Sequence, residues 1–137
     1  MPIKMNNLQE AAFYGDCRDI LKALEQGQEP NAFDKTGTSA VHKAAANGRT
    51  KALHVLVEHG GNVNLRDSTG CTALHAAARN GHLNTLKWLV EHGGDIKVES
   101  TKGNTPRLSA KSQSQSEVVA YLKKLEREKF DWETEEV

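Results

Sequence analysis

The 137 residues suit one domain with a modest core, and eighteen basic residues balance eighteen acidic ones, which excludes a strong electrostatic drive toward nucleic acid or a membrane surface. Two cysteines exclude a disulfide framework and a cysteine-based metal set, and they indicate a reducing compartment. The sequence shows no signal-peptide core and no apolar run near the ~20 residues that a membrane span needs, so we expect a soluble protein of the cytoplasm, with the nucleus as a further location.

A long internal repeat organises the chain. Residues 34–66 align with residues 67–99 without a gap, and 16 of the 33 positions are identical. Gly15 upstream and Gly103 downstream fall in register with the glycines of both copies. Such a fixed period indicates that one supersecondary unit is repeated along the chain.

The first unit covers about residues 1–33 and differs from the full copies. It lacks the Asp-x-x-Gly turn, and Gln9 stands where the copies have histidine. Polar Asn6, Asn7 and Glu10 begin its first helix. A terminal unit has no neighbour on one side, so we expect this unit to be a cap that shows a polar face to water.

Residues 34–66 and 67–99, the second and third units, follow the full pattern. The third unit serves as the example for both. Glycine ends each helix because it adopts the backbone conformation that other residues resist. Leucine and valine recur at helical spacing in the second helix of the unit. The elements expected in the third unit are a turn at 67–70, a helix-capping Thr72, an alanine-rich helix over 73–80 ended by Gly81, a second helix over 83–92 ended by Gly93 and Gly94, and an extended segment at 95–99.

The fourth unit, about residues 100–125, departs most from the pattern. Arg107 stands at an apolar position, and Ser114 replaces the helix-ending glycine. We expect another cap, whose first helix is short or irregular and is followed by a mobile loop at 112–116. Val118, Val119, Leu122 and Leu125 still predict an apolar stripe on the second helix.

The acidic tail, residues 126–137, is expected to extend the last helix to about Lys129 or to be partly disordered. Phe130 and Trp132 are expected to fold back over the last layer, because the fourth unit covers that end poorly. A disordered, solubilising tail and a linear motif for a partner are the alternatives.

The sequence D-x-x-G-x-T-x-L-H-x-A-A-x-x-G-H, followed by a helix and GGDI, resembles the ankyrin repeat. Residues 67–96 match closely, and residues 34–66 depart only at Ser39, Val41 and Arg49. The resemblance covers about residues 6–125. It implies an all-α solenoid of about four stacked helix-turn-helix layers with projecting β-turn or hairpin loops. Such an array is stabilised by the interfaces between its layers.

The six histidines raise the possibility of a metal site, but their spacing does not favour one. The sequence contains no H-E-x-x-H motif, no Cys/His cluster and no phosphate-binding glycine loop. The resemblance implies that His42 and His75 bond instead to Ser39 and Thr72 and to nearby backbone. Cys71 has no neighbour in sequence that would activate its thiol. We therefore expect no catalytic residue, no metal and no cofactor.

The resemblance implies a non-catalytic protein–protein interaction module that acts as an adaptor, scaffold or inhibitor. Partners of such arrays dock on the concave face, which the turn tips and inner helices form. Its aromatic and basic residues favour an acidic or amphipathic segment of another protein as the partner. The residues that the register places on this face are Phe13, Tyr14, Phe33, Lys35, Thr36, Thr38, Ala46, Asn47, Arg66, Ser68, Thr69, Cys71, Arg79, Asn80, Glu99, Thr101, Lys102 and Asn104.

Several alternatives stay open at this point. Phe13 and Tyr14 also suit a plug at the open end of the first layer, and Phe33 suits packing between adjacent turns. Trp88 is expected to be partly buried on the convex side. A nucleic-acid-associated regulatory factor that acts through protein contacts, and a small metal-binding protein, are the alternative functions. The chain is expected to be a monomer or a weak end-to-end dimer, with no direct contact to nucleic acid.

Overall fold

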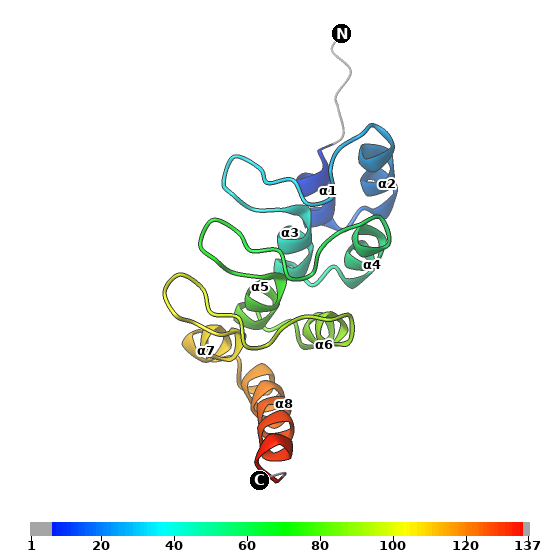
Figure 1. The fold of residues 1–137 in the computed structure, drawn as a ribbon. Coiled ribbons are helices and arrows are strands. Elements are labelled where there is room, and N and C mark those ends of the chain that lie inside the picture. The colour runs from blue at the N-terminus through cyan, green and yellow to red at the C-terminus, as the bar shows by residue number, and fades with distance from the viewer. Residues whose placement is uncertain (1–6, 136–137) are drawn as a thin grey trace.

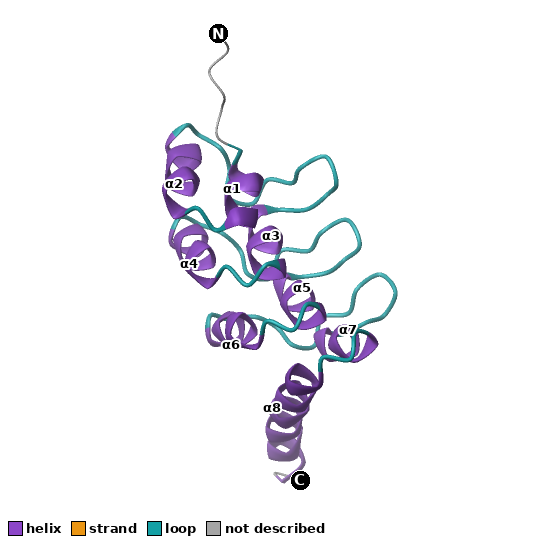
Figure 2. Ribbon diagram, turned by 180° about the vertical axis from the view of Figure 1, so that it is seen from behind, coloured by secondary structure: helices purple, strands orange, loops and turns teal. Residues whose placement is uncertain are grey.

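Four helix pairs stack along one axis, and hairpin loops project from the same side of the stack (Figure 1). The computed structural model describes residues 7–135, and their side chains through Glu128. Seen from behind, the described chain consists of helices and loops (Figure 2). The expected all-α fold of stacked helix-turn-helix layers is therefore confirmed. The helices are α1 (Leu8–Tyr14), α2 (Cys17–Glu25), α3 (Ala40–Ala46), α4 (Thr50–Glu58), α5 (Ala73–Arg79), α6 (Leu83–Glu91), α7 (Pro106–Ser112) and α8 (Ser116–Glu135).

The first helix of every layer has seven residues and starts at a polar cap. Asn7, Ser39 and Thr105 accept a hydrogen bond from the backbone three residues later, and Thr72 occupies the same position on α5. Isolated helices this short are marginal in water. Their stability therefore depends on packing against the neighbouring layers.

The core lies between adjacent layers rather than inside any one of them. Alanines such as Ala44, Ala45 and Ala77 are fully buried where the inner helices α1, α3, α5 and α7 pack side by side. Their small side chains allow the helices to approach closely. Leucines of the outer helices, among them Leu53 and Leu86, fill the space behind them.

The projecting loops are bonded to one another from layer to layer. The Ser68 amide donates to the Gly37 carbonyl at 3.1 Å, and the Thr101 amide donates to the Thr69 carbonyl at 3.0 Å. The loop at residues 33–39 also closes on itself through an antiparallel bridge between Phe33 and Ser39. These bonds hold the loop tips in fixed positions relative to the inner helices.

A second series of contacts joins the layers at the turn between the two helices of each pair. One position of successive units carries a side-chain nitrogen that contacts a backbone carbonyl of the preceding layer. These nitrogens are Arg49 Nε, His82 Nε2 and Gln115 Nε2. The accepting carbonyls belong to Phe13, Ala46 and Arg79, which also share one register position, at 3.3, 3.0 and 3.1 Å.

The expectation of a short or irregular first helix in the fourth unit is wrong, because α7 has the same length as α1, α3 and α5. Pro106 is buried at its start, and Arg107 Nε donates to Glu126 Oε2 of α8 at 2.8 Å. This ion pair accommodates the arginine at an apolar position. Residues 113–115 connect α7 to α8. The expected loop at 112–116 is therefore shorter than expected, because residues 112 and 116 belong to these two helices.

The last helix, α8, continues to Glu135, beyond the expected end near Lys129. It leaves the stack at its C-terminal end (Figure 1). The side chains of Phe130 and Trp132, which were expected to cover the last layer, lie outside the described residues.

Replacing Ser114 with glycine should stabilise the fold by roughly 0.5–1 kcal/mol. Ser114 has a φ of 58°, in the position that glycine occupies in the first three layers. A left-handed conformation costs a non-glycine residue about 1–2 kcal/mol, and the added flexibility of glycine in the unfolded chain offsets part of the gain. Urea unfolding of the wild type and Ser114→Gly measures the difference. Unchanged or reduced stability would contradict this explanation.

Candidate interaction surface

The inner helices and the hairpin loops form one continuous side of the stack (Figure 1). Three large hydrophobic side chains are exposed at its N-terminal end: Phe13 by 40%, Tyr14 by 63% and Phe33 by 48%. All three side chains are therefore accessible to a partner, and none belongs to the buried core. Of the other residues predicted for this face, those exposed are Lys35, Thr36, Arg66, Ser68, Thr69, Arg79, Asn80, Glu99, Thr101, Lys102 and Asn104, and those half-buried are Thr38, Ala46, Asn47 and Cys71.

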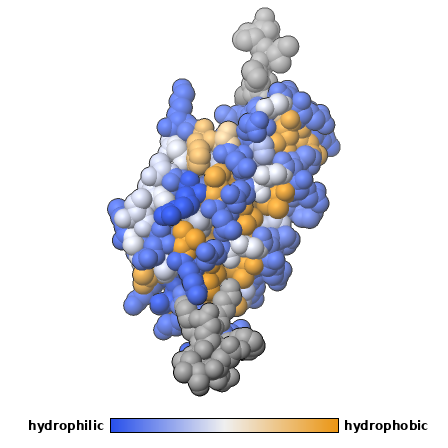
Figure 3. Space-filling model, viewed as in Figure 1, coloured by the Kyte–Doolittle hydropathy of each residue, from blue (hydrophilic) through white to orange (hydrophobic). Residues whose placement is uncertain are grey.

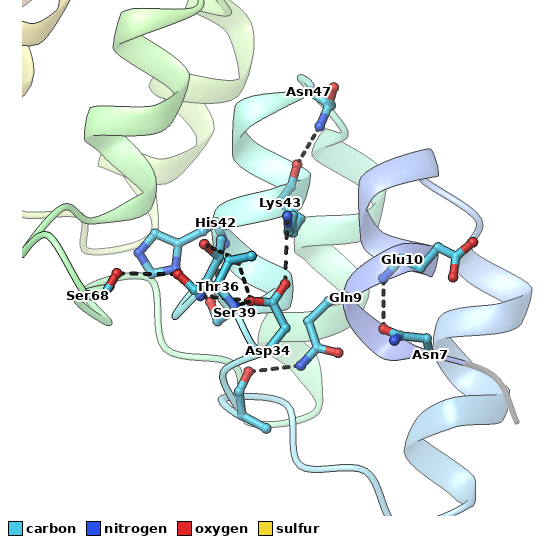
Figure 4. Close-up of polar contacts among 12 residues, drawn as sticks. Asn7, Gln9, Glu10, Asp34, Thr36, Ser39, His42, Lys43, Asn47 and Ser68 are labelled. Atoms are coloured by element: carbon cyan, nitrogen blue, oxygen red, sulfur yellow. Dashed lines mark hydrogen bonds and ion pairs between the residues drawn. The ribbon is translucent and has the colours of Figure 1, made fainter.

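A first hollow lies between layers one and two, beneath the aromatic residues. The rings of Phe13 and Tyr14 meet edge to face with centroids 5.0 Å apart. Lys43 Nζ lies 3.7 Å from Asp34 Oδ2, so the basic group in this hollow is already paired (Figure 4). The hollow is lined by Asn7, Gln9, Glu10, Phe13, Tyr14, Asp34 and Lys43.

Several predicted contact residues of the loops are occupied in holding the loops together. Asp34 Oδ1 accepts from the Thr36 hydroxyl at 2.6 Å and from the amides of Thr36 and Thr38 at 2.9 and 3.1 Å. The Thr36 hydroxyl, followed by these amides, lowers the pKa of Asp34 despite some desolvation. Asp67 repeats the arrangement one layer on, with Thr69 and the Cys71 amide.

Burial alone raises the pKa of Asp67, but hydrogen bonds from Thr69 and Cys71 outweigh it and lower the pKa overall. The two aspartates are therefore ionised acceptors that shape the loops. Thr36, Thr38 and Thr69 serve this local purpose whether or not a partner is bound.

Arg66 is also committed to the fold. Its Nε donates to the Gly70 carbonyl at 3.1 Å, and its Nη2 donates to the Glu99 carbonyl of the next layer at 2.6 Å. Replacing Arg66 would disturb two loops as well as any bound partner. It is a poor probe of binding for that reason, although the register places it on the predicted face.

A second hollow lies between layers three and four, bounded by α5, α7 and the loop between Ser100 and Asn104. Its lining contains two cations and no carboxylate. Arg79 and Lys102 were both predicted for the concave face, and the structure brings them to one place. The lining residues are Thr69, Cys71, Arg79, Ser100, Lys102, Asn104, Ser109 and Ser112.

The two predicted asparagines cap the inner helices. Asn47 Nδ2 donates to the Lys43 carbonyl at 3.0 Å (Figure 4). Asn80 Nδ2 donates to the Ala76 carbonyl at the same distance, 3.0 Å. They shape the edge of the face.

His42 and His75 form the buried contacts that the resemblance implies. His42 Nδ1 lies 2.7 Å from the Ser39 hydroxyl, and His42 Nε2 lies 2.8 Å from the Cys71 carbonyl of the next layer. His75 repeats this with Thr72 and with the Asn104 carbonyl, at 3.1 and 2.7 Å. A carbonyl only accepts, so each Nε2 carries the proton and donates. Burial lowers the pKa of both histidines and keeps them neutral.

No group of three or more potential metal ligands comes together among the described residues. The neutral histidines bond to protein atoms at both ring nitrogens, so they are not available as ligands.

On the convex side, Trp88 of α6 contacts the rings of two histidines. Its ring stacks on His92 at 3.9 Å and meets His54 edge-on at 6.3 Å. Trp88 is half-buried, in agreement with the packing role expected for it. In the view of Figure 3, hydrophobic residues are interrupted by hydrophilic ones over all four layers, without one continuous apolar area.

Sequence reasoning missed Lys43, Ser109 and Ser112 as surface residues. Lys43 and Ser109 share one register position, so the internal repeat contained the signal for both. Ser112 lies on α7, whose regular course was not expected.

No described helix has both the length and the apolar character that crossing a membrane requires. A family model described as ankyrin repeats, in three copies, matches residues 8–100. A search of curated proteins found no match.

Proposed function

The chain belongs to the ankyrin repeat family, and on this premise we propose that it binds one partner protein through its concave face and acts as an adaptor, scaffold or inhibitor. Ankyrin repeats are generally protein–protein interaction modules and are typically non-enzymatic. Any enzymatic output would then come from the partner. We place this activity in the cytoplasm, with the nucleus as a further location.

The observation that carries the proposal is the exposure of Phe13, Tyr14 and Phe33 on loops and helices that are fixed by inter-layer hydrogen bonds. Aromatic side chains are common energetic anchors of interfaces. A surface that is already ordered loses little conformational entropy when a partner binds. The basic residues farther along the same face favour a partner segment that is acidic at one end and apolar at the other.

A paired substitution tests which face binds. Tyr14→Ser with Phe33→Ser should weaken binding to a captured partner at least 30-fold, because interface anchors contribute about 2 kcal/mol or more. The matched control is Leu21→Ser on α2, since Leu21 is 39% exposed but lies on an outer helix. Quantitative affinity capture from a lysate, followed by titration with the purified partner, gives the comparison. Loss of binding in the Leu21 variant alone would assign the interface to the convex side.

A further inference from the structure

The second hollow, between α5, α7 and the loop at residues 100–104, has a volume of about 220 Å³. Its lining comes from three separate parts of the chain. Arg79 lies at the end of α5, Ser109 lies on α7, and Lys102 and Asn104 lie in the loop. The backbone of this loop is fixed, because Thr101 bonds to Thr69 and His75 bonds to the Asn104 carbonyl.

Four donor side chains meet in this hollow without an internal partner. Within the described residues, the guanidinium of Arg79, the ammonium of Lys102, the side-chain amide of Asn104 and the hydroxyl of Ser109 form no hydrogen bond or ion pair with the protein. This contrasts with the first hollow, where Lys43 is paired with Asp34.

Among the described residues, neither cation of the second hollow is paired with a carboxylate. Arg79 and Lys102 bring two positive charges, and none of the lining residues is acidic. Two carboxylates stand outside this lining: Asp67 accepts three hydrogen bonds from Thr69 and Cys71, and Glu99 Oε1 lies 3.9 Å from the position that a Cβ on Gly103 would take. A ligand that fits carries negative charge and several acceptor oxygens.

We propose that this hollow binds a phosphorylated serine or threonine of the partner segment, which deepens the proposed function and rests on it. A phosphate monoester carries about −1.5 to −2 charge at pH 7 and presents three acceptor oxygens. It matches two cations and two neutral donors. A carboxylate carries a single negative charge, so it balances only one of the two cations.

The position of the hollow also defines the partner segment. The aromatic hollow lies between layers one and two, and the cationic hollow lies between layers three and four. Packed helices are about 8–10 Å apart, so the two hollows are separated by about 16–20 Å. An extended chain advances about 3.3 Å per residue, so the phosphorylated residue should lie about five or six residues from an apolar one.

Nuclear magnetic resonance titration of the full chain with N-acetyl-phosphoserine amide tests the proposal. We expect shifts confined to the amides near residues 69–71, 79, 100–104 and 109–112. N-acetyl-glutamate amide should bind at least ten-fold more weakly. Arg79→Gln and Lys102→Gln should each weaken phosphoserine binding at least five-fold, and Lys51→Gln, at an exposed position of the outer helix α4, should leave it unchanged.

The proposal is overturned if the glutamate compound binds equally well, if the Arg79 and Lys102 variants bind as the wild type does, or if the shifts spread over other surface lysines. Stronger binding of a short single-stranded oligonucleotide would overturn it in favour of a nucleic acid. Phosphatase treatment of a captured partner separates the two proposals. Retained binding after treatment would remove the phosphate inference and leave concave-face binding intact.

Discussion

Lowering the pH from 7 to 5 should destabilise the folded chain steeply, and His42 and His75 should account for most of the loss. Both rings are at most 2% exposed, and burial lowers the pKa of each below the usual 6.5. Below pH 6.5 these two histidines are therefore protonated more readily in the unfolded chain than in the folded chain. Stability from this source is fully present above pH 6.5 and declines as the pH falls from 6.5 through the folded pKa values.

The expected slope approaches about 1.4 kcal/mol per pH unit for each histidine, or about 2.7 kcal/mol for both, while the pH lies between the folded and unfolded pKa values. His75 should resist protonation more than His42. Its Nδ1 accepts from the Thr72 backbone amide at 3.0 Å, and a backbone amide can donate a hydrogen bond but cannot accept one from a protonated ring. The hydroxyl of Ser39 beside His42 can rotate and accept instead.

Urea unfolding at pH 7, 6 and 5 measures this dependence. Asp34 and Asp67 affect stability at a lower pH. Because their pKa values are lowered in the folded chain, the stability that they contribute is lost only as the pH falls below about 3.8. The control is His59→Gln, since the imidazole of His59 contacts only a carbonyl of its own helix. If the free energy of unfolding were the same at pH 7 and pH 5, protonation of the two buried rings would not destabilise the fold, and the prediction would be wrong.

Replacing His75 with leucine should cost about 3–5 kcal/mol at neutral pH. The change preserves much of the side-chain volume but leaves the Thr72 amide and hydroxyl and the Asn104 carbonyl without their partner. Each buried polar group that loses its hydrogen bond costs about 1–3 kcal/mol. Chemical unfolding at pH 7.5, where the wild-type histidine is neutral, gives the value.

Leu108 offers the matched reverse substitution. It occupies the position of the fourth unit that His75 occupies in the third, and it is 36% exposed. Within residues 7–135 no layer packs beyond the fourth, so no described carbonyl stands where a histidine at this position would reach it. Leu108→His should therefore change stability by less than about 0.5 kcal/mol, as surface substitutions usually do. If His75→Leu were equally mild, the contact between layers would not be the reason for histidine at this position.

The repeat made most of the architecture predictable before the structure. The expected helices over 73–80 and 83–92 agree with α5 and α6 except for one residue at the end of each, and Thr72 precedes α5 as expected. Glycine and leucine at a fixed period report local backbone conformation and burial, which depend on nearby residues. Such features can be inferred from sequence because each copy confirms the other.

Features that depend on distant partners could not be predicted in this way. Arg107 looked incompatible with a regular helix, because nothing in the sequence shows that Glu126 lies beside it. Arg66 looked like a free interface residue, although it bonds to the Gly70 and Glu99 carbonyls. The cationic hollow also could not be predicted, since Ser109 joins the predicted residues Arg79, Lys102 and Asn104 only when α7 is placed against α5.

The turn contacts made by Arg49, His82 and Gln115 have a consequence for how copies of this unit are compared. A guanidinium, an imidazole and an amide perform one task at equivalent positions, because the requirement is a long side chain with an N–H at its end. An identity score records mismatches at these positions where the molecule makes a single interaction three times. Substitution tables weighted by donor capacity would detect divergent units of this kind that residue matching overlooks.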